Sequence, residues 1–496
     1  MNQRILKLTF PLDALSSVLA SPALSAAQAP HKQVFCDEYF DTPDLALVRA
    51  GVELRVRHSG GGREALVRSH EPDIHAVMEH VEWAGGGVAS ETFEWITDEK
   101  TRQLLDTHQP RLQPLFRIAQ QRELRVLRPR DEVEIEVVID TGELRHESSC
   151  LPIAELSLRL RRGRFADLLT HAIALCDGLS FYPIGHSKSA RGYALASPAS
   201  IRPVRSSALK RPACNDVVGV FVGLATQLHC CWRTNLWGAL GSSDPEFIHQ
   251  FRVAIRRLRA LIRLFKPVLP GGFVKRWVRL LRDVANTVGS ARDLDVILDS
   301  IIRPAYQRRP EPAVAALIRQ IEAARARTRR ASHDALIAGS HGVLLLDFLH
   351  DLESLPSPPD PMPLGAFLGR RLDRMRARAS SRLADAEQSG RADDLHRLRI
   401  ALKNLRYGCD VMVVLFGTQA VRAYSQRLSA LQDDLGYLND LAVALELIAK
   451  WEQSSTVTQG ARQAVALEHA NRSETVALSA IRTAHDSLSE AAPWAV

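Results

Sequence analysis

The sequence of 496 residues contains only seven cysteines, and no two of them are spaced as Cys-x-x-Cys. An odd number of scattered cysteines favours neither a disulfide framework nor a zinc ribbon, so we expect a reducing, cytoplasmic location. The sequence also has no uncharged apolar run of about 18 residues, which predicts that no helix spans a membrane. Residues 4–29 have some features of a secretory signal, but Pro11 and Asp13 interrupt their apolar part.

The basic and acidic residues are unevenly distributed along the chain. Apolar residues make up 46% and charged residues 24%, which excludes disorder and collagen-like structure and predicts two to four domains. Residues 1–200 hold 23 basic and 27 acidic side chains, a net charge of −4. The rest of the chain holds the remaining 41 basic and 29 acidic side chains, a net charge of +12. The second part is therefore the expected polyanion binder.

Local patterns divide the chain into two domains of different fold class. Residues 1–195 contain short runs of alternating polar and apolar residues bounded by turn residues, which predict an α+β domain with an antiparallel sheet. Residues 196–212 are rich in Pro, Ser and basic residues and are expected to be a linker. Apolar residues at helical spacing over 213–485 predict an all-α bundle, with a break at 355–363.

The helical part contains an internal repeat with a shift of 147 residues. His249, Arg252, Arg256 and Arg259 recur as His396, Arg399, Lys403 and Arg406, and Arg263 extends the first set. Each set of four lies on one 80° face of a helix, over roughly 15 Å. A chain of this composition contains such a pattern about 0.04 times by chance. Two repeats of one helical unit, about 213–354 and 364–485, are therefore expected.

A single basic stripe is most often a solvated helix face, but the duplication favours a binding role. Like charges on one helix face repel one another, so an anion between the two stripes explains best why they are retained. Arg suits phosphate because its planar group donates two hydrogen bonds to one phosphate, and Lys and protonated His add charge. Asp293, Asp295 and Asp440 are candidates to orient these cations, or else ordinary carboxylates at helix ends.

The helical part resembles the CHAD domain, the conserved histidine α-helical domain. The similarity rests on HQFRVAIRRLRALIRLF (249–265), GSARDLDV (289–296), HRLRIALKNLRY (396–407) and LQDDLGYLNDLAVA (431–444). It implies a pseudo-twofold helical domain whose basic groove binds inorganic polyphosphate. The implied ligands are His249, Arg252, Arg256, Arg259, Arg263, His396, Arg399, Lys403 and Arg406.

Residues 1–195 contain the motifs YFDTPDLALVRAGVELRVR (39–57), EIEVVIDTGEL (134–144) and SKSARGYAL (187–195). Through these motifs the segment resembles a CYTH domain, which often precedes a CHAD domain. This resemblance implies an antiparallel tunnel barrel whose inward cations bind a triphosphate and whose glutamates hold Mg or Mn. The implied triphosphate ligands are Lys7, Arg55, Arg57, Arg68, Arg117, Lys188 and Arg191.

The acidic half of this family pattern is incomplete. The two opening glutamate positions hold Gln3 and Ile5, and the late Glu-x-Glu-x-Glu strand reads Glu155, Ser157, Arg159. An amide is a poorer ligand for a hard cation than a carboxylate, and an inward arginine repels a metal. Glu82, Glu134, Glu136 and Glu155 remain, and the candidates for a weak metal site are Glu134, Glu136 and Glu155.

Three functions are therefore compared. The first is a polyphosphate-binding protein whose tunnel domain has partly lost its metal-binding glutamates. The alternative is an inorganic triphosphatase that uses Mg or Mn to hydrolyse tripolyphosphate, with Lys7 and Glu155 as catalytic candidates. Nucleic-acid binding is disfavoured, because the stripes lack interleaved aromatic residues that stack on bases. The resemblance also suggests association with polyphosphate granules, and the oligomeric state stays open.

Overall fold

The computed structural model describes residues 5–24, 27–70, 80–85, 93–179, 181–183, 187–197, 202–206, 209–242, 244–288, 294–338, 341–356, 362–453, 458 and 460–494. Gln3, Gly289, Arg292 and Asp293 lie outside these ranges, as do parts of the expected linker and of the break at 355–363. Two compact units are present. Unit 1 comprises residues 1–204, 229–247 and 340–354, and unit 2 comprises residues 205–228, 248–339 and 355–496.

These units differ from the predicted domain boundaries. Residues 229–247 and 340–354 were expected in the helical domain but group with the sheet. In unit 1, helix α12 (His341–Glu353) packs on α4 (Phe165–Cys176), and its Leu346 joins the core of the sheet. Gly342 permits this approach, since a Cβ there would lie 1.7 Å from the carbonyl oxygen of Phe181. Helix α6 (Val217–Gly241) contributes residues to both units.

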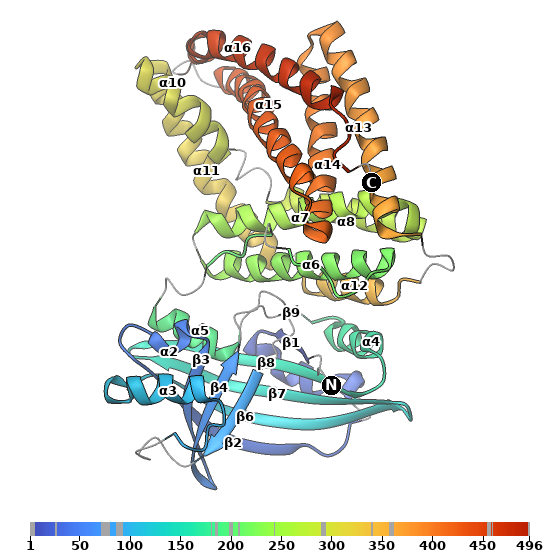
Figure 1. Ribbon diagram of the computed structural model, residues 1–496. Coiled ribbons are helices and arrows are strands. Elements are labelled where there is room, and N and C mark those ends of the chain that lie inside the picture. Colours follow the sequence, from blue (N-terminus) through green and yellow to red (C-terminus); the bar gives the residue numbers. More distant parts are fainter. Residues whose placement is uncertain are drawn as a thin grey trace. The chain divides into compact units, whose positions relative to one another are not determined.

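Unit 1 is built on an antiparallel nine-stranded sheet (Figure 1). Its order is β5-β4-β3-β2-β6-β7-β8-β1-β9, and the long strands β6 to β8 are joined by two-residue turns. The strand bounds are β1 Ile5–Thr9, β2 His31–Asp41, β3 Val52–Ser59, β4 Gly62–His70, β5 His80–Gly85, β6 Gln113–Arg130, β7 Val133–His146, β8 Ser149–Arg162 and β9 Tyr182–Pro183. The predicted α+β class is confirmed.

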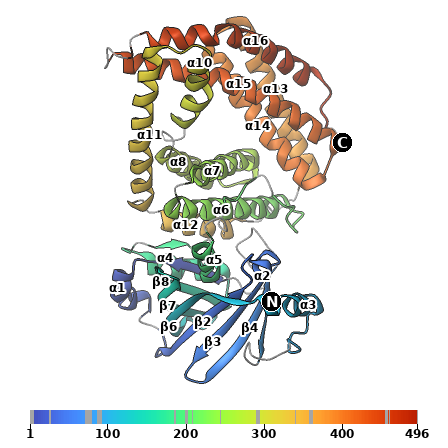
Figure 2. The same cartoon turned by 90° about the vertical axis from the view of Figure 1, so that its left-hand side faces the viewer.

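The two faces of this sheet differ in character because successive side chains in a strand alternate between them. One face of β1, β7 and β8 is apolar and is covered by α1 (Leu15–Leu19) and α4. The other face, called the inner face below, carries many charged side chains, together with an apolar cluster of Tyr39, Phe116, Ile118, Leu144 and Ile153. The sheet is strongly curved (Figure 2), and short helices α2 (Ala46–Arg49), α3 (Glu99–His108) and α5 (Lys188–Ala196) complete the unit.

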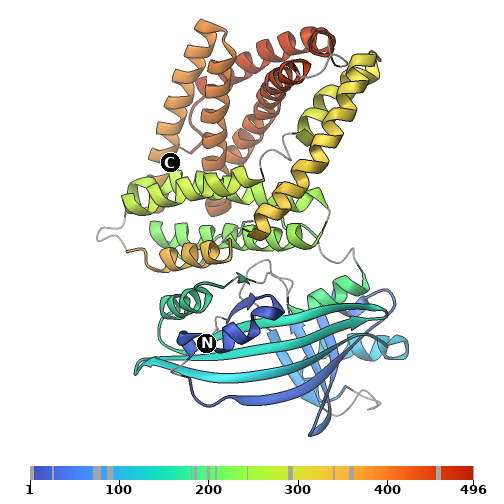
Figure 3. The ribbon, with the colours of Figure 1, turned by 180° about the vertical axis from the view of Figure 1, so that it is seen from behind.

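Unit 2 is helical, as predicted. Helices α13, α14, α15 and α16 pack in succession (Figure 3). The remaining bounds are α7 Pro245–Phe265, α8 Gly271–Thr287, the π-helical turn η6 Ile297–Ile302, α10 Arg303–Arg308, α11 Pro312–Ala338, α13 Leu364–Ser389, α14 Ala392–Phe416, α15 Gln419–Glu452 and α16 Ala461–Ser489.

Helix bounds reproduce the repeat found in the sequence. A shift of 147 residues places the start of α6 at Leu364, where α13 begins, and the start of α7 at Ala392, where α14 begins. The same shift places α11 on α16 and places both α8 and η6 on the single long helix α15. The duplication therefore extends to helix length and order.

Candidate phosphate-binding sites

The inner face of the sheet in unit 1 is defined by the strand register. Lys7 on β1 lies opposite Ser157 on β8, with Ile5 opposite Arg159 and Thr9 opposite Glu155. Side chains at opposed positions share a face. The inner face carries Lys7, Glu155, Ser157, Arg159, Glu136, Asp140, Gln120, Arg122, Asp37, Tyr39, Glu53, Arg55, Arg57, Arg68 and Glu82.

Curvature of the sheet brings its two ends together around these side chains. Arg68 on β4 lies close enough to Lys7 on β1 for its charge to act on the lysine. Burial lowers the pKa of Lys7 to about 8, with a further contribution from Lys188 and Arg68, while Glu155 opposes this shift. Helix α5 closes the space, because Ser189 donates a hydrogen bond of 2.8 Å to Glu53 on β3 and Arg191 pairs with Glu155 on β8.

Six of the seven predicted triphosphate ligands lie on the inner face or on α5 beside it, in the region called the tunnel below. They are Lys7, Arg55, Arg57, Arg68, Lys188 and Arg191. The seventh, Arg117, is a correction: it is exposed and alternates with inward Ile118 and Phe116, so it belongs to the outer face of β6. A position inside a strand pattern does not reveal its face until the register is known.

Acidic partners neutralise most of these cations. Arg57 donates two hydrogen bonds, of 2.7 and 2.8 Å, to Asp37, which is 2% exposed. Arg55 and Arg68 both contact Glu82, at 2.9 and 2.8 Å. Such bidentate and shared pairs hold the guanidinium groups in fixed orientations. A phosphate in the tunnel would therefore compete with carboxylates that are already in place.

Sequence reasoning missed one part of this network, which is centred on Asp140. Arg122 donates to Asp140 at 2.8 Å, and Lys188 pairs with the same carboxylate. Burial by itself would raise the pKa of Asp140, but hydrogen bonds from Arg122 and Lys188 hold it below its usual value. Asp140 follows Glu136 by four residues on one strand, so strict alternation along 134–144 could have identified it.

The predicted metal ligands do not converge. Glu155 lies opposite Asp140, whereas Glu136 lies opposite Arg159, four residues or about 13 Å further along β7. Glu136 is held by Arg159 at 3.3 Å and by Arg161, and Glu134 pairs with Arg128 at 2.9 Å near the strand end. Within the described ranges, no group of three or more His, Cys, Asp or Glu could hold a metal ion. The donor set described here therefore does not fit Mg or Mn.

In unit 2 the two basic stripes lie on α7 and α14. Arg257 on α7 reaches Asp410 on α14 at 3.5 Å, and its guanidinium carbon lies 5.8 Å from the ring centroid of Tyr407. The stripe side chains themselves are half-buried, apart from exposed His396. All nine predicted polyphosphate ligands are therefore carried by two neighbouring helices.

Lys403 marks the place where the stripes meet. Burial, together with the charges of Arg256, Arg399, Arg406 and Arg259, lowers the pKa of Lys403 to about 7. Two of these arginines belong to α7 and two to α14. The Nε atoms of Arg256 and Arg259 are buried and have no hydrogen-bond partner. A bound anion would stabilise such a cluster of incompletely paired cations.

The ends of the stripes are positioned by the helices that follow them. Arg252 donates to the carbonyl oxygen of Val288 at 3.3 Å, and Nη2 of Arg399 lies 4.0 Å from where a Cβ of Gly436 would be. Position 288 corresponds to 435, next to Gly436, so the two arginines reach neighbouring positions of the repeat.

Of the two suggested orienting aspartates within the described residues, Asp440 is connected to a stripe and Asp295 is not. Asn439 Oδ1 lies 2.6 Å from Nδ1 of His396, and Asn439 Nδ2 donates to Asp440 at 3.2 Å. Asp295 pairs instead with Arg325 and Arg329 of α11, at 2.5 and 3.1 Å. The suggestion for Asp295 is therefore wrong, because its carboxylate is directed to a different helix.

Both halves of the chain match known domain families. Residues 5–193 match the CYTH domain and residues 225–449 match the CHAD domain. The chain belongs to the two-domain proteins in which a CYTH domain precedes a CHAD domain.

Solved structures resemble each half separately. The CHAD domain from the plant Ricinus communis is 26% identical with a TM-score of 0.50, over 59% of this chain and 98% of that one. PptA from Streptomyces chartreusis is 18% identical over 55% of this chain and 100% of that one, with a TM-score of 0.43. HpAC1 from Hippeastrum, described as having a dominant triphosphatase activity, is 15% identical. The match covers 39% of this chain and 95% of that one, with a TM-score of 0.29.

Two further expectations concern membranes and thiols. In the part of the chain that the structure describes, no single helix is long and apolar enough to cross a membrane, although α11 and α12 taken together would meet that test by length and composition.

Cys36, Cys150, Cys176, Cys214 and Cys409 are free thiols.

Proposed function

We propose that this protein binds inorganic polyphosphate along the facing basic stripes of α7 and α14, which are together called the groove below. The observation that carries this proposal is Lys403, an ammonium group surrounded by four arginines from both helices. A linear polyanion would neutralise all five groups at once, and its phosphates would accept hydrogen bonds from the guanidinium groups of the stripes. Binding of this kind releases condensed counterions, so affinity is expected to fall steeply with salt.

The tunnel of unit 1 has a secondary role in this proposal. Its cations suit tripolyphosphate or the end of a longer chain, but they are largely neutralised by Asp37, Glu82, Asp140 and Glu155. In the groove, Arg406 lies 3.5 Å from Asp410 and the charge of Asp283 acts on Arg259, while Nε of Arg256 and Nε of Arg259 have no hydrogen-bond partner. We therefore assign the main anion site to the groove in this proposal.

The free thiols and the resemblance to granule-associated proteins support a cytosolic location near stored polyphosphate. We include this location in the proposal. A fluorescent fusion that remains diffuse in cells rich in polyphosphate would contradict the association.

Charge reversal in both stripes tests the groove. Arg252→Glu combined with Arg399→Glu is expected to abolish binding of a polyphosphate of about 100 units at moderate salt, because two repeat-equivalent contacts become repulsive. The matched control is Arg462→Glu with Arg482→Glu, two exposed positions on α16 that give the same change in net charge. Since Arg252 also contacts the end of α8, thermal unfolding must show that the groove variant is folded.

Retained binding by the folded groove variant would overturn the proposal. Competition provides a second readout against nucleic acid. RNA at equal phosphate concentration is expected not to displace polyphosphate, because the stripes offer charge without stacking platforms. Equal displacement by RNA would show that the groove binds polyanions in general.

A further inference from the structure

The basic groove of unit 2 is not symmetric at the carboxyl end of α7. Arg263 and Lys266, at this end, correspond in the second copy to Asp410 and Val413. Asp410 is occupied by Arg257 and Arg406, each at 3.5 Å, and accepts a hydrogen bond of 2.7 Å from Ser425. The second copy is therefore neutralised where the first copy stays basic.

Two pockets adjoin this basic end and share Arg263 and Lys266. The first has a volume of about 590 Å³ and extends along α8. The second has a volume of about 450 Å³ and extends along α13. We call the two together the α7-end site; its basic residues are Arg259, Arg263, Lys266, Lys275, Arg279, Arg282, Arg371, Arg374 and Arg378.

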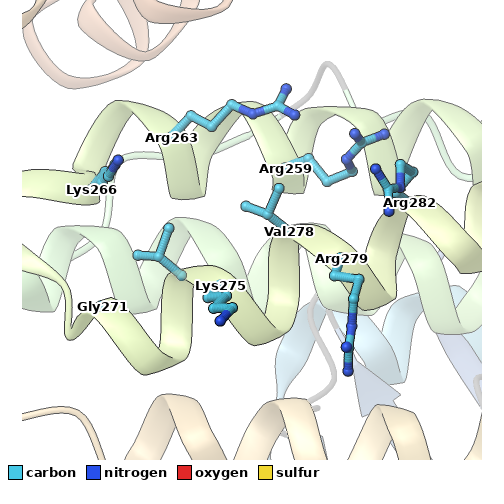
Figure 4. A pocket seen from close by; sticks show the side chains of 9 residues that line it. Arg259, Arg263, Lys266, Gly271, Lys275, Val278, Arg279 and Arg282 are labelled. Carbon is cyan, nitrogen blue, oxygen red and sulfur yellow. The ribbon is translucent and has the colours of Figure 1, made fainter.

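Figure 4 shows how the first pocket continues the α7 stripe. Arg259 and Arg263 follow one another along α7, and Arg282 of α8 approaches Arg259. Lys266 lies beyond Arg263, whereas Lys275 and Arg279 extend away on the other side of α8. The charges of Arg263 and Arg282, added to burial, lower the pKa of Arg259. The stripe and the α7-end site thus form one continuous positive field.

Most of these additional charges have no basic counterpart at the equivalent position of the other copy. Among the exposed arginines, Arg279 and Arg282 correspond to Gln426 and Ser429, and Arg374 and Arg378 correspond to Gln227 and Cys231. Lys275 is an exception, since Arg422 occupies its equivalent position.

These charges are not balanced by carboxylates within the site. Among the described residues that line the two pockets there is no aspartate or glutamate, although Asp283 lies 3.6 Å from Arg282. Uncompensated like charge on three neighbouring segments is self-repulsive, and an anion removes that repulsion.

We propose that the α7-end site binds the part of a polyphosphate chain that extends beyond the paired stripes, and that it makes the protein selective for long chains. This inference rests on the proposed binding of polyphosphate in the groove. A chain held between α7 and α14 presents its next phosphates to Arg263 and Lys266 at high effective concentration, so the added contacts increase affinity without a second association cost. A chain that is too short to leave the stripes gains nothing from them.

Exposed basic residues without a basic counterpart in the other copy allow a test that leaves the groove intact. Lys266→Glu combined with Arg374→Glu alters both pockets at exposed positions and spares the stripes. For a chain of about 100 units at low salt, the affinity of this variant is expected to be at least about tenfold lower than that of the wild type. The slope of log affinity against log salt is expected to decrease by about one for each lost contact.

Chain length is the deciding variable. In the wild type, the affinity per polyphosphate chain is expected to rise with the number of phosphate units, from tripolyphosphate to long chains. In the α7-end variant, the affinity should stop rising at a shorter chain length. Tripolyphosphate itself should bind both proteins equally. Arg462→Glu with Arg482→Glu controls for net charge and is expected to follow the wild type at every length.

The outcomes separate this inference from the proposed function. If the α7-end variant matches the wild type at every chain length while the Arg252 and Arg399 variant no longer binds, the inference is wrong and the groove proposal stands. An equal loss in the α16 control would also overturn the inference, since net charge would explain the effect. If the wild type binds no polyphosphate, the proposed function itself fails.

Discussion

Lys403 on α14 and Arg256 on α7 lie so close that the guanidinium group helps to lower the pKa of the lysine. They come from different copies of the repeat, at the same position of the basic pattern, since 256 and 403 differ by 147. The repeat therefore places equivalent cations against one another, across the groove. The protonation of Lys403 in the groove is therefore expected to depend on both pH and a bound polyanion.

Polyphosphate binding is expected to tighten as pH falls through about 7. The free protein carries Lys403 with a pKa of about 7, so most of the amine is neutral at pH 8. A bound polyanion raises that pKa, which means that binding above pH 7 takes up a proton. Titrations with a long chain from pH 6.5 to 8.5 measure the slope.

The matched variant for this prediction is Lys403→Arg. Its guanidinium stays charged over the whole range, so the dependence of affinity on pH above 7 should be much weaker. An unchanged slope in this variant would show that Lys403 does not govern the pH dependence of binding.

Removing the charge of Lys403 is expected to stabilise unit 2 while weakening binding. Between pH 10.5 and about 7 the unfolded protein holds a proton on this residue that the folded protein lacks, so stability decreases as pH falls through that window. Lys403→Met should therefore raise the free energy of unfolding at pH 6 by on the order of 2 to 4 kcal/mol.

The gain in the free energy of unfolding of Lys403→Met should disappear near pH 11, where lysine is largely neutral in both the folded and the unfolded protein. Calorimetry at the two pH values, together with polyphosphate titration, measures both effects. A destabilised Lys403→Met protein at pH 6 would show that the ammonium group is already compensated in the free groove.

Tripolyphosphate is not expected to be hydrolysed by metal-dependent chemistry in the tunnel. Glu155 is held by Arg191 and Lys188, and its neighbour Asp140 by Arg122, so neither carboxylate is available in the described site as a metal ligand. Phosphate release with Mg or Mn at neutral and alkaline pH should be the same in wild type and in Glu155→Ala. Turnover that is lost in both Glu155→Ala and Lys7→Ala would establish a triphosphatase function instead.

Helix α5 is expected to tolerate no side chain at position 192. A Cβ at Gly192 would lie 2.1 Å from the ring of Phe116, so the helix could not pack on β6 without moving. Gly192→Ala should lower the free energy of unfolding of unit 1 by about 1 to 3 kcal/mol. The displaced helix should also weaken tripolyphosphate binding, because it carries Lys188 and Arg191.

Gly369→Ala on α13 is the control for this substitution. The nearest atom to its added Cβ is 3.9 Å away, and alanine favours a helix interior by about 1 kcal/mol. Calorimetry of the full chain should show one transition shifted in Gly192→Ala and not in the control. A Gly192→Ala protein as stable as the wild type would mean that α5 packs loosely.

The sequence alone was sufficient for features that depend on local spacing. The 147-residue shift predicted the second copy, and α13 and α14 begin at the residues it requires. The stripes could be predicted because a helix presents every third or fourth residue on one face, whatever it packs against.

Only the tertiary structure decided which charges remain uncompensated, because ion pairing depends on contacts between residues far apart in the chain. Arg117 and Arg122 look alike in the sequence, but the register of β6 directs one outward and the other to Asp140. Glu136 and Glu155 both suit a metal by residue type, yet the strand pairing places them about 13 Å apart. In unit 2 the packing of α7 against α14 leaves Lys403 among four arginines, which no spacing within either helix could indicate.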